Sequence, residues 1–188
     1  RTALGLARAD TRPFFAALSE LKQEGFFLRH PVRIILRATG HDELYSESLT
    51  DLGISDFVTL EPGVPYRDAL QEMLKADGLL IFQSSGCNHQ IPAKAYEYLR
   101  AGRPILSLTD SAGDTAQLLL RNGQSAIADL LDKDDIKSAI RTFVPGIAAS
   151  EGGPDIDVLR YTRRGQTAHL AALFDELSGK GAASETTQ

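Results

Sequence analysis

The sequence predicts an α/β domain built around a doubly wound parallel sheet of about six strands. Two observations lead to this fold class. Short apolar runs alternate with longer segments of helical spacing from residue 4 to residue 143, which is typical of right-handed β-α-β crossovers. In addition, residues 78–82 read Gly-Leu-Leu-Ile-Phe without a polar interruption, as expected of a strand that is buried on both faces of a parallel sheet.

The first half of the chain contains three predicted strand–helix pairs. Apolar runs predict strands at residues 4–6, 32–36 and 57–60. Apolar residues at helical spacing predict one helix between Thr11 and Gly25, and further helices at 42–52 and 66–74. Thr11 is the expected N-cap of the first helix, Pro13 lies in its first turn, and Gly25 ends it.

The second half continues this alternation and then changes character. Strands are predicted at 78–82, 104–108 and 125–128, and helices at 91–101, 114–122 and 134–143. Residues 144–154 contain Gly, Ala and Pro and are predicted to form a linker. A last long helix is expected at 157–177, either continuous or broken near Gly165, and the polar residues 179–188 are predicted to form a disordered tail.

Composition and residue spacing argue against several kinds of partner. The net charge is −5, and Lys and Arg are scattered along the chain, so no nucleic acid is expected as a partner. No apolar run approaches the roughly 20 residues that span a bilayer, so no transmembrane segment is expected. The single Cys87 rules out an internal disulfide, which fits a cytoplasmic protein.

Motifs that hold cofactors or metals are missing or misplaced. No Gly-x-Gly-x-x-Gly follows the first predicted strand, and there is no P-loop, which disfavours NAD binding and ATP hydrolysis. The four histidines show neither i,i+4 pairing nor cysteine partners. Residues 155–157 read Asp-Ile-Asp, but they precede the last helix, where capping is the expected role. No metal and no cofactor are therefore expected.

The most informative stretch is residues 76–106. A strand and a loop are followed by a helix that contains Pro92-Ala-Lys94-Ala-Tyr-Glu97-Tyr-Leu, then by Ala-Gly-Arg-Pro and another strand. This arrangement resembles the group 1 glycosyltransferases, retaining enzymes whose donor-binding domain carries Pro-x-Lys-x-x-Glu-Tyr-Leu and Ala-Gly-x-Pro at these places. The resemblance implies that residues 1–178 form a Rossmann-like, nucleotide-sugar-binding domain, the C-terminal half of a GT-B fold. It also implies that an N-terminal acceptor domain is absent from this chain.

The helix predicted at 91–101, with Pro92 in its first turn, carries the main candidate residues. Ligands bind at the carboxyl ends of the strands in such a sheet, and the helix N-terminus there favours an anion such as a diphosphate. Lys94 adds a positive charge, and Glu97 lies three residues on, on the same face. The resemblance implies that Lys94 holds the diphosphate and that Glu97 accepts hydrogen bonds from the ribose hydroxyls. The alternative is an exposed ion pair between these two side chains.

Two departures from the family pattern concern the diphosphate and the sugar. The family often has two glutamates separated by seven residues. Glu97 matches the second of them, and the position of the first is occupied by His89. Two roles stay open for His89: contact with the donor phosphate or sugar, or a place in a solvated loop. With Lys94 and Glu97, His89 completes the candidate catalytic set. The family holds the diphosphate with an Arg and a Lys after the first strand. Here Arg8 and Arg12 follow that strand, at an unusual spacing.

Two further segments at the same edge of the predicted sheet are candidates for donor binding. Val64 belongs to a Pro-Gly-Val run that resembles the end of the strand before the base-binding loop of the family. Gly113, Asp114 and Thr115 open another helix, and their N–H groups either contact phosphate or sugar or belong to a plain helix cap with Asp114 as the N-cap.

The resemblance implies a complete reaction: transfer of a hexose from a nucleotide diphosphate sugar to a saccharide or lipid-linked acceptor, with retention. The leaving diphosphate is expected to be stabilised by helix N-termini and basic side chains, without a metal. The location is expected to be cytoplasmic, either free or at the inner face of the membrane through the absent domain. This chain alone is expected to be inactive. Two alternatives stay open: a sugar-nucleotide epimerase of the same fold, and a non-catalytic nucleotide-binding module.

Overall fold

The computed structural model describes residues 10–149 and 156–178. The chain divides into two compact units, Arg1–Pro154 and Asp155–Gln188, and each is described by itself. The strand predicted at residues 4–6 lies outside the described residues, and so does the tail predicted at 179–188.

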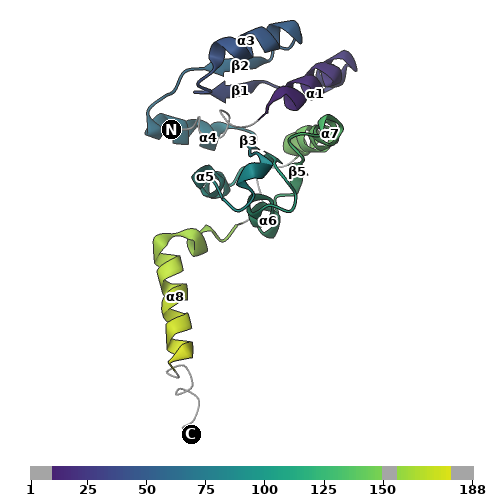
Figure 1. Ribbon diagram of the computed structural model, residues 1–188. Coiled ribbons are helices and arrows are strands. Elements are labelled where there is room, and N and C mark those ends of the chain that lie inside the picture. The colour runs from purple at the N-terminus through teal and green to yellow at the C-terminus, as the bar shows by residue number, and fades with distance from the viewer. Residues whose placement is uncertain (1–9, 150–155, 179–188) are drawn as a thin grey trace. The chain divides into compact units, whose positions relative to one another are not determined.

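The strands of the first unit form two parallel sheets (Figure 1). In one sheet β1 pairs with β2, and in the other β4 lies between β3 and β5. The strand bounds are β1 (Ile34–Arg37), β2 (Val58–Glu61), β3 (Leu79–Phe82), β4 (Ile105–Leu108) and β5 (Ala126–Ala128). The α/β class and the parallel pairing are confirmed. The prediction of a single sheet of about six strands is not confirmed, because β1 and β3 each pair with only one of the five described strands.

Helices connect the strands of the first unit. Their bounds are α1 (Arg12–Gln23), α2 (Phe26–Arg29), α3 (Asp42–Asp51), α4 (Tyr66–Lys75), α5 (Ala93–Ala101), α6 (Asp114–Arg121) and α7 (Lys133–Ala149), with a 3₁₀ turn, η1 (Ser85–Cys87), before α5. The helix predicted at 91–101 begins two residues late because Pro92 is its N-cap, with extended backbone at ψ 141°, and a residue before proline disfavours helical dihedrals. Thr11 occupies the N-cap of α1, as predicted, although its side chain makes no capping hydrogen bond.

The linker predicted at residues 144–154 is wrong for its first six residues. The helix α7 continues to Ala149 with Pro145 inside it, although proline removes one hydrogen bond of the helix. Packing explains the continuation. A Cβ on Gly78, at the start of β3, would lie 2.7 Å from Cδ1 of Ile147 and 3.0 Å from the ring of Phe143. The last turns of α7 are therefore held against the backbone of Gly78.

The second unit contains η2 (Val158–Tyr161) and α8 (Arg163–Leu177). The predicted interruption of the last helix is confirmed, but it lies at Thr162, which caps α8 by accepting a hydrogen bond from the backbone N–H of Gly165 at 3.0 Å. A Cβ on Gly165 would lie 2.2 Å from the carbonyl oxygen of Leu159. Glycine is thus needed where η2 meets the first turn of α8. Asp157 accepts a hydrogen bond from the N–H of Leu159, which is the capping role predicted for it.

The helix α1 joins the two sheets through one core. Phe14 and Phe15 are both 1% exposed. The ring of Phe14 packs edge-on against Phe82 of β3, with ring centres 5.1 Å apart. The ring of Phe15 packs against Tyr45 of α3 at 5.7 Å. Neighbouring side chains of one helix therefore contact the two halves of the unit, and the core around them contains residues of both sheets.

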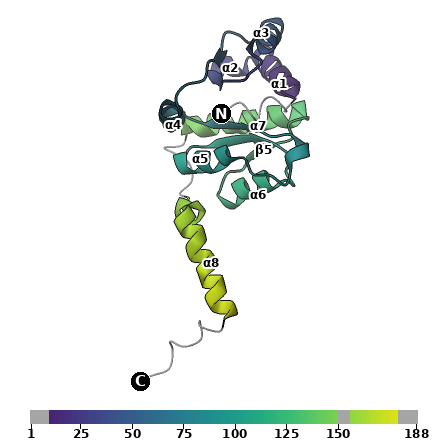
Figure 2. The same ribbon diagram turned by 60° about the vertical axis from the view of Figure 1, so that its left-hand side comes forward.

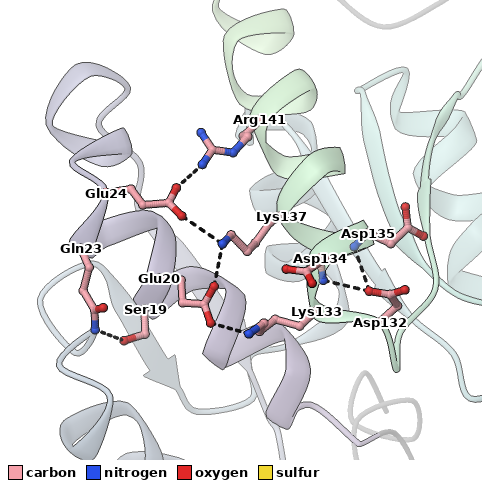
Figure 3. Close-up of polar contacts among 10 residues, drawn as sticks. All are labelled: Ser19, Glu20, Gln23, Glu24, Asp132, Lys133, Asp134, Asp135, Lys137 and Arg141. Carbon is pink, nitrogen blue, oxygen red and sulfur yellow. Dashed lines mark hydrogen bonds and ion pairs between the residues drawn. The ribbon is translucent and has the colours of Figure 1, made fainter.

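Ion pairs connect α1 to α7, which lie side by side (Figure 1 and Figure 2). Figure 3 shows two carboxylates of α1 between three cations of α7. Glu20 accepts from Lys133 at 2.5 Å and from Lys137 at 2.6 Å. Glu24 accepts from Lys137 at 3.0 Å and also pairs with Arg141. Hydrogen bonds from Lys133 to Glu20 and from Lys137 to Glu24 hold the pKa of both carboxyl groups below the ordinary value.

Replacing Phe14 by alanine tests whether α1 is the central packing element. Loss of a buried aromatic ring leaves a cavity between α1 and β3, so Phe14→Ala should lower the free energy of unfolding by about 3–5 kcal/mol. The control is Leu28→Ala, because Leu28 is 89% exposed and should change the value by no more than about 0.5 kcal/mol. Urea denaturation measures both. Equal effects of the two substitutions would show that α1 does not have this role.

The ion pairs between α1 and α7 predict a dependence of stability on pH. Because the folded pKa values of Glu20 and Glu24 lie below the ordinary 4.5, the pairs stabilise the fold above that pH. This stabilisation is lost as the pH falls below 4.5 and through the folded pKa values. The double variant Glu20→Gln, Glu24→Gln should unfold at a lower urea concentration than the wild type at pH 7, and the difference should vanish in acid. A difference that stays constant with pH would contradict this assignment.

Candidate functional site

The candidate residues lie at the carboxyl ends of the strands in the first unit. Because the strands are parallel within each sheet, the segments that follow β3 and β4 leave from one edge of their sheet, and the segment that follows β2 leaves from the edge of the other sheet at which β1 also ends. Two of the helices that begin there, α4 and α5, contact each other. Figure 2 shows α5 beside the second sheet, with α6 on the next connection. These are the elements that position the candidate residues.

The N-terminus of α5 has no capping side chain. Pro92 is the N-cap and makes no side-chain hydrogen bond to the first turn. A proline at this position has no N–H of its own, and the N–H of Ala95 donates to the carbonyl of Pro92 at 2.9 Å. The N–H groups of Ala93 and Lys94 have no described acceptor and are available to a ligand or to water. The structure therefore places Pro92 one position before the predicted first turn, at an uncapped helix end that carries a partial positive charge.

Lys94 lies in the first turn of this helix and is half-buried. Burial lowers the pKa of its amino group because a less hydrated ammonium ion is disfavoured. Among residues 10–149 and 156–178 no carboxylate is paired with it. The alternative prediction of an exposed ion pair with Glu97 is thus wrong for this structure. What remains is a partly dehydrated cation beside the N-terminus of a helix, which suits an anionic ligand.

Glu97 lies one turn further along α5 and is also half-buried. Its Oε1 accepts a hydrogen bond of 3.0 Å from the phenol of Tyr66, the first residue of α4. The contact raises the pKa of the Tyr66 phenol, because a phenolate would lose this hydrogen bond and face the carboxylate. Tyr66 was missed in the sequence reasoning. Its only signal there is an aromatic residue at the start of a helix, directly after Pro65.

The segment before Tyr66 is held by a half-buried arginine that the sequence reasoning also missed. Arg37, at the end of β1, donates to the carbonyl of Pro62 at 2.6 Å and makes a bidentate pair with Glu72 of α4 at 2.7 and 2.8 Å. Such a pair fixes geometry as well as charge. Val64 lies within the segment and is half-buried. The start of α4, and with it Tyr66, is thus attached to β1.

The loop after β3 is fixed by one buried amide. The side-chain nitrogen of Gln83 donates to the carbonyl of Cys87 at 2.7 Å and to that of Gln90 at 2.6 Å. Its side-chain oxygen accepts from the hydroxyl of Thr115 at 2.6 Å. Both Gln83 and Thr115 are buried. His89, which this loop carries, is exposed and is held in place by the backbone on either side of it.

A second set of contacts ties this loop to the start of α6. Asn88 donates to the carboxylate of Asp110 at 2.5 Å, and the backbone N–H of Asp114 donates to the carbonyl of Asn88 at 2.8 Å. A Cβ on Gly113 would lie 3.3 Å from Oδ1 of Asn88. The N-cap of α6 is Gly113 and not Asp114, which corrects the predicted cap. In this structure Gly113, Asp114 and Thr115 all contact the loop after β3.

The arginines predicted after the first strand are placed only in part. Arg8 lies outside the described residues. Arg12 begins α1 and has an exposed side chain whose guanidinium pairs with Asp10 at 2.5 Å. The structure therefore brings Pro92, Lys94, Glu97 and Tyr66 to one place, and it links Gly113, Asp114 and Thr115 to the loop that carries His89. No described contact joins Arg12 to either group.

The described residues contain no group of His, Cys, Asp and Glu side chains that is arranged to hold a metal ion. No helix in that part of the chain has both the length and the apolar character needed to cross a bilayer. Two surface hollows of the first unit lie along α3, and neither is lined by a candidate residue.

Comparison with known proteins adds no identification. No family model matches the sequence, and no curated protein matches it either. The geometry of the residues around α5 therefore carries the functional argument.

Replacing Thr115 by valine tests the fixation of the loop after β3. The variant keeps the shape of the side chain but leaves the amide oxygen of Gln83 buried without its donor, so the free energy of unfolding should fall by about 1–3 kcal/mol. Amide hydrogen exchange should also become faster at residues 84–90. The control is Thr142→Val, because the hydroxyl of Thr142 is exposed and bonds only within its helix. Unchanged exchange in Thr115→Val would contradict this role.

Proposed function

We propose that this chain is the donor-binding domain of a retaining glycosyltransferase, which transfers a hexose from a nucleotide diphosphate sugar to a saccharide or lipid-linked acceptor. The observation that carries the proposal is the start of α5. There, a half-buried lysine without an acidic partner among the described residues lies one turn before a half-buried glutamate, on a helix whose N-terminus has no capping side chain. This is the geometry that a diphosphate and a ribose require together.

The diphosphate would bind at the N-terminus of α5. The first-turn N–H groups and the ammonium of Lys94 offer hydrogen bonds and positive charge to the same anion. The partial burial of Lys94 strengthens its attraction to a charged ligand, because less water screens the interaction. During transfer the bond between the anomeric carbon and the diphosphate oxygen breaks. The diphosphate then leaves with the electron pair, and Lys94 and the helix N-terminus stabilise the charge that develops on it.

The ribose would bind at Glu97. A carboxylate offers about four acceptor sites on two oxygens, so it can accept hydrogen bonds from two neighbouring hydroxyls even while it accepts one from Tyr66. The separation along α5 also fits a nucleotide, because Lys94 and Glu97 are one helical turn apart, about 5 Å along the axis. The base would then lie toward the segment of residues 62–65, which contains Val64.

In this proposal the two sheets are parts of one Rossmann-like sheet of six strands. Two observations support a single sheet. The residues of β3 are largely buried although β3 pairs with only one described strand. In addition, α1, which follows residues 4–6 in the chain, packs against β3 and α3 through Phe14 and Phe15.

The acceptor site would belong to a second domain of the same protein, because the groups around α5 account for the donor alone. The chain by itself is then expected to bind nucleotide diphosphates but not to transfer sugar. No metal is needed in this scheme, because Lys94 and the N-terminus of α5 supply the positive charge. Binding is therefore expected to persist in EDTA.

Calorimetric titration with UDP and GDP tests the proposal. Glu97→Gln keeps the size of the side chain but replaces charged hydrogen-bond acceptors by neutral ones, so the dissociation constant should rise about five- to thirtyfold. Lys94→Ala should weaken binding of diphosphates more than binding of nucleosides. The effect should shrink with added salt, because the screening length falls from about 10 Å at 0.1 M to about 3 Å at 1 M.

Matched controls for these variants lie on the surface of the same unit. Glu43→Gln in α3 and Lys75→Ala in α4 remove exposed charges of the same types, and neither should change the dissociation constant. A purely structural role for Lys94 and Glu97 predicts the opposite pattern, with changed stability and unchanged binding. If the two variants bind both nucleotides as tightly as the wild type, the proposed site is wrong.

A further inference from the structure

The hydrogen bond between Tyr66 and Glu97 links two separate connections of the fold. Tyr66 begins α4, which follows β2, whereas Glu97 belongs to α5, which follows β3. The phenol donates to Oε1 of Glu97 at 3.0 Å, while Tyr66 as a whole remains 65% exposed. The side chain therefore contributes little to the core. The one hydrogen bond that its side chain makes within the described residues is directed at the carboxylate to which the proposed function assigns the ribose.

The hydrogen bond from Tyr66 restricts the side-chain conformations of Glu97. A free glutamate side chain samples many rotamers, and ordering such a side chain on binding costs on the order of 0.5–1.5 kcal/mol. Tyrosine has few rotatable bonds, and the start of α4 is itself held by Arg37 through Pro62 and Glu72. The hydroxyl of Tyr66 therefore offers a fixed donor to the carboxylate. No described residue donates a hydrogen bond to the second oxygen of Glu97, which leaves it available to a ligand.

We infer that Tyr66 is a positioning residue: its hydroxyl holds the Glu97 carboxylate ready for the two ribose hydroxyls, and so makes the site select ribose over sugars that lack them. This inference rests on the proposed function and adds the residue that sets sugar selectivity. Tyr66 does not contact the reacting atoms in this scheme. Its effect on binding passes through Glu97 alone.

The charges near the phenol keep it in the donating form. The Glu97 carboxylate raises the pKa of Tyr66, and Arg100, further along α5, acts in the opposite direction with a smaller effect. The phenol is therefore protonated at neutral pH. Because its folded pKa lies above the ordinary value of 10.0, the hydrogen bond is complete below pH 10 and is lost as the pH rises through the folded pKa.

Titrating the full chain with UDP and with 2′,3′-dideoxy-UDP tests the inference. Tyr66→Phe removes only the hydroxyl, so the dissociation constant for UDP should rise about three- to tenfold, and that for the dideoxy compound should not change. In the Glu97→Gln background the same substitution should have much less effect, because the two residues act through one hydrogen bond. Tyr161→Phe, in the second unit, is the control and should change neither constant.

Each other outcome overturns the inference in a distinct way. If UDP binding depends on Glu97 but is unchanged in Tyr66→Phe, the donor site stands and Tyr66 has no positioning role. If Tyr66→Phe binds UDP more tightly, the phenol competes with the ribose for the carboxylate. If the wild type binds no nucleotide diphosphate, both this inference and the proposed function are wrong.

The contact itself can be checked without any ligand. A spectrophotometric titration of the tyrosines, taken as the difference between wild type and Tyr66→Phe, reports the pKa of Tyr66. That pKa should fall in Glu97→Gln, because the neutral amide no longer disfavours a phenolate. An unchanged pKa would show that the hydrogen bond is not formed in solution and would overturn the inference on structural grounds.

Discussion

Burial of the apolar face of α1 is the constraint on which the rest of the first unit depends. The two sheets share no described strand pairing, so hydrogen bonds between strands do not unite them. Phe14 reaches β3, and Phe15 reaches α3, while the ion pairs of Glu20 and Glu24 attach the same helix to α7. Only the apolar contacts are buried, and exposed ion pairs contribute little to stability. The position of β1 relative to β3 is therefore set by packing, with the ion pairs fixing the orientation of α1 on α7.

At the carboxyl ends of the strands, some polar groups serve only to shape the protein, whereas others are left available to a ligand. The polar groups of Gln83 and Thr115 are satisfied within the protein, so they shape the loop after β3 and have little capacity left for a ligand. The amide nitrogen of Asn88 donates to Asp110, whereas its buried Oδ1 has no hydrogen-bond partner among the described residues. The N-terminus of α5 differs, because no side chain caps it. A loop made rigid by internal hydrogen bonds, followed at once by an uncapped helix end, presents the helix N–H groups in a defined direction.

Local patterns were sufficient to predict most elements and the centre of the candidate site. The buried run before Phe82, the proline before α5 and the Lys94–Glu97 spacing are all properties of neighbouring residues, and these predictions could be made from one sequence. The starts of α5 and α6 are each shifted slightly from the predicted positions, but the larger errors concern long-range packing: α7 continues through Pro145 because Ile147 and Phe143 meet Gly78. Tyr66 and Glu97 are likewise 31 residues apart, and no local pattern indicates that their side chains touch. The arrangement of the sheets could not be predicted for the same reason.

The pairing of basic side chains gives the strongest physical argument for a ligand at α5. Lys133, Lys137 and Arg141 have carboxylate partners, and Arg37 has both a carboxylate and a carbonyl. An exposed cation without a partner costs little, because water solvates it. Lys94 is different: it is partly dehydrated, its pKa is lowered for that reason, and it has no acidic partner within the described chain. Folding therefore disfavours its charged form, and an anion bound at the adjacent helix N-terminus would reverse that penalty.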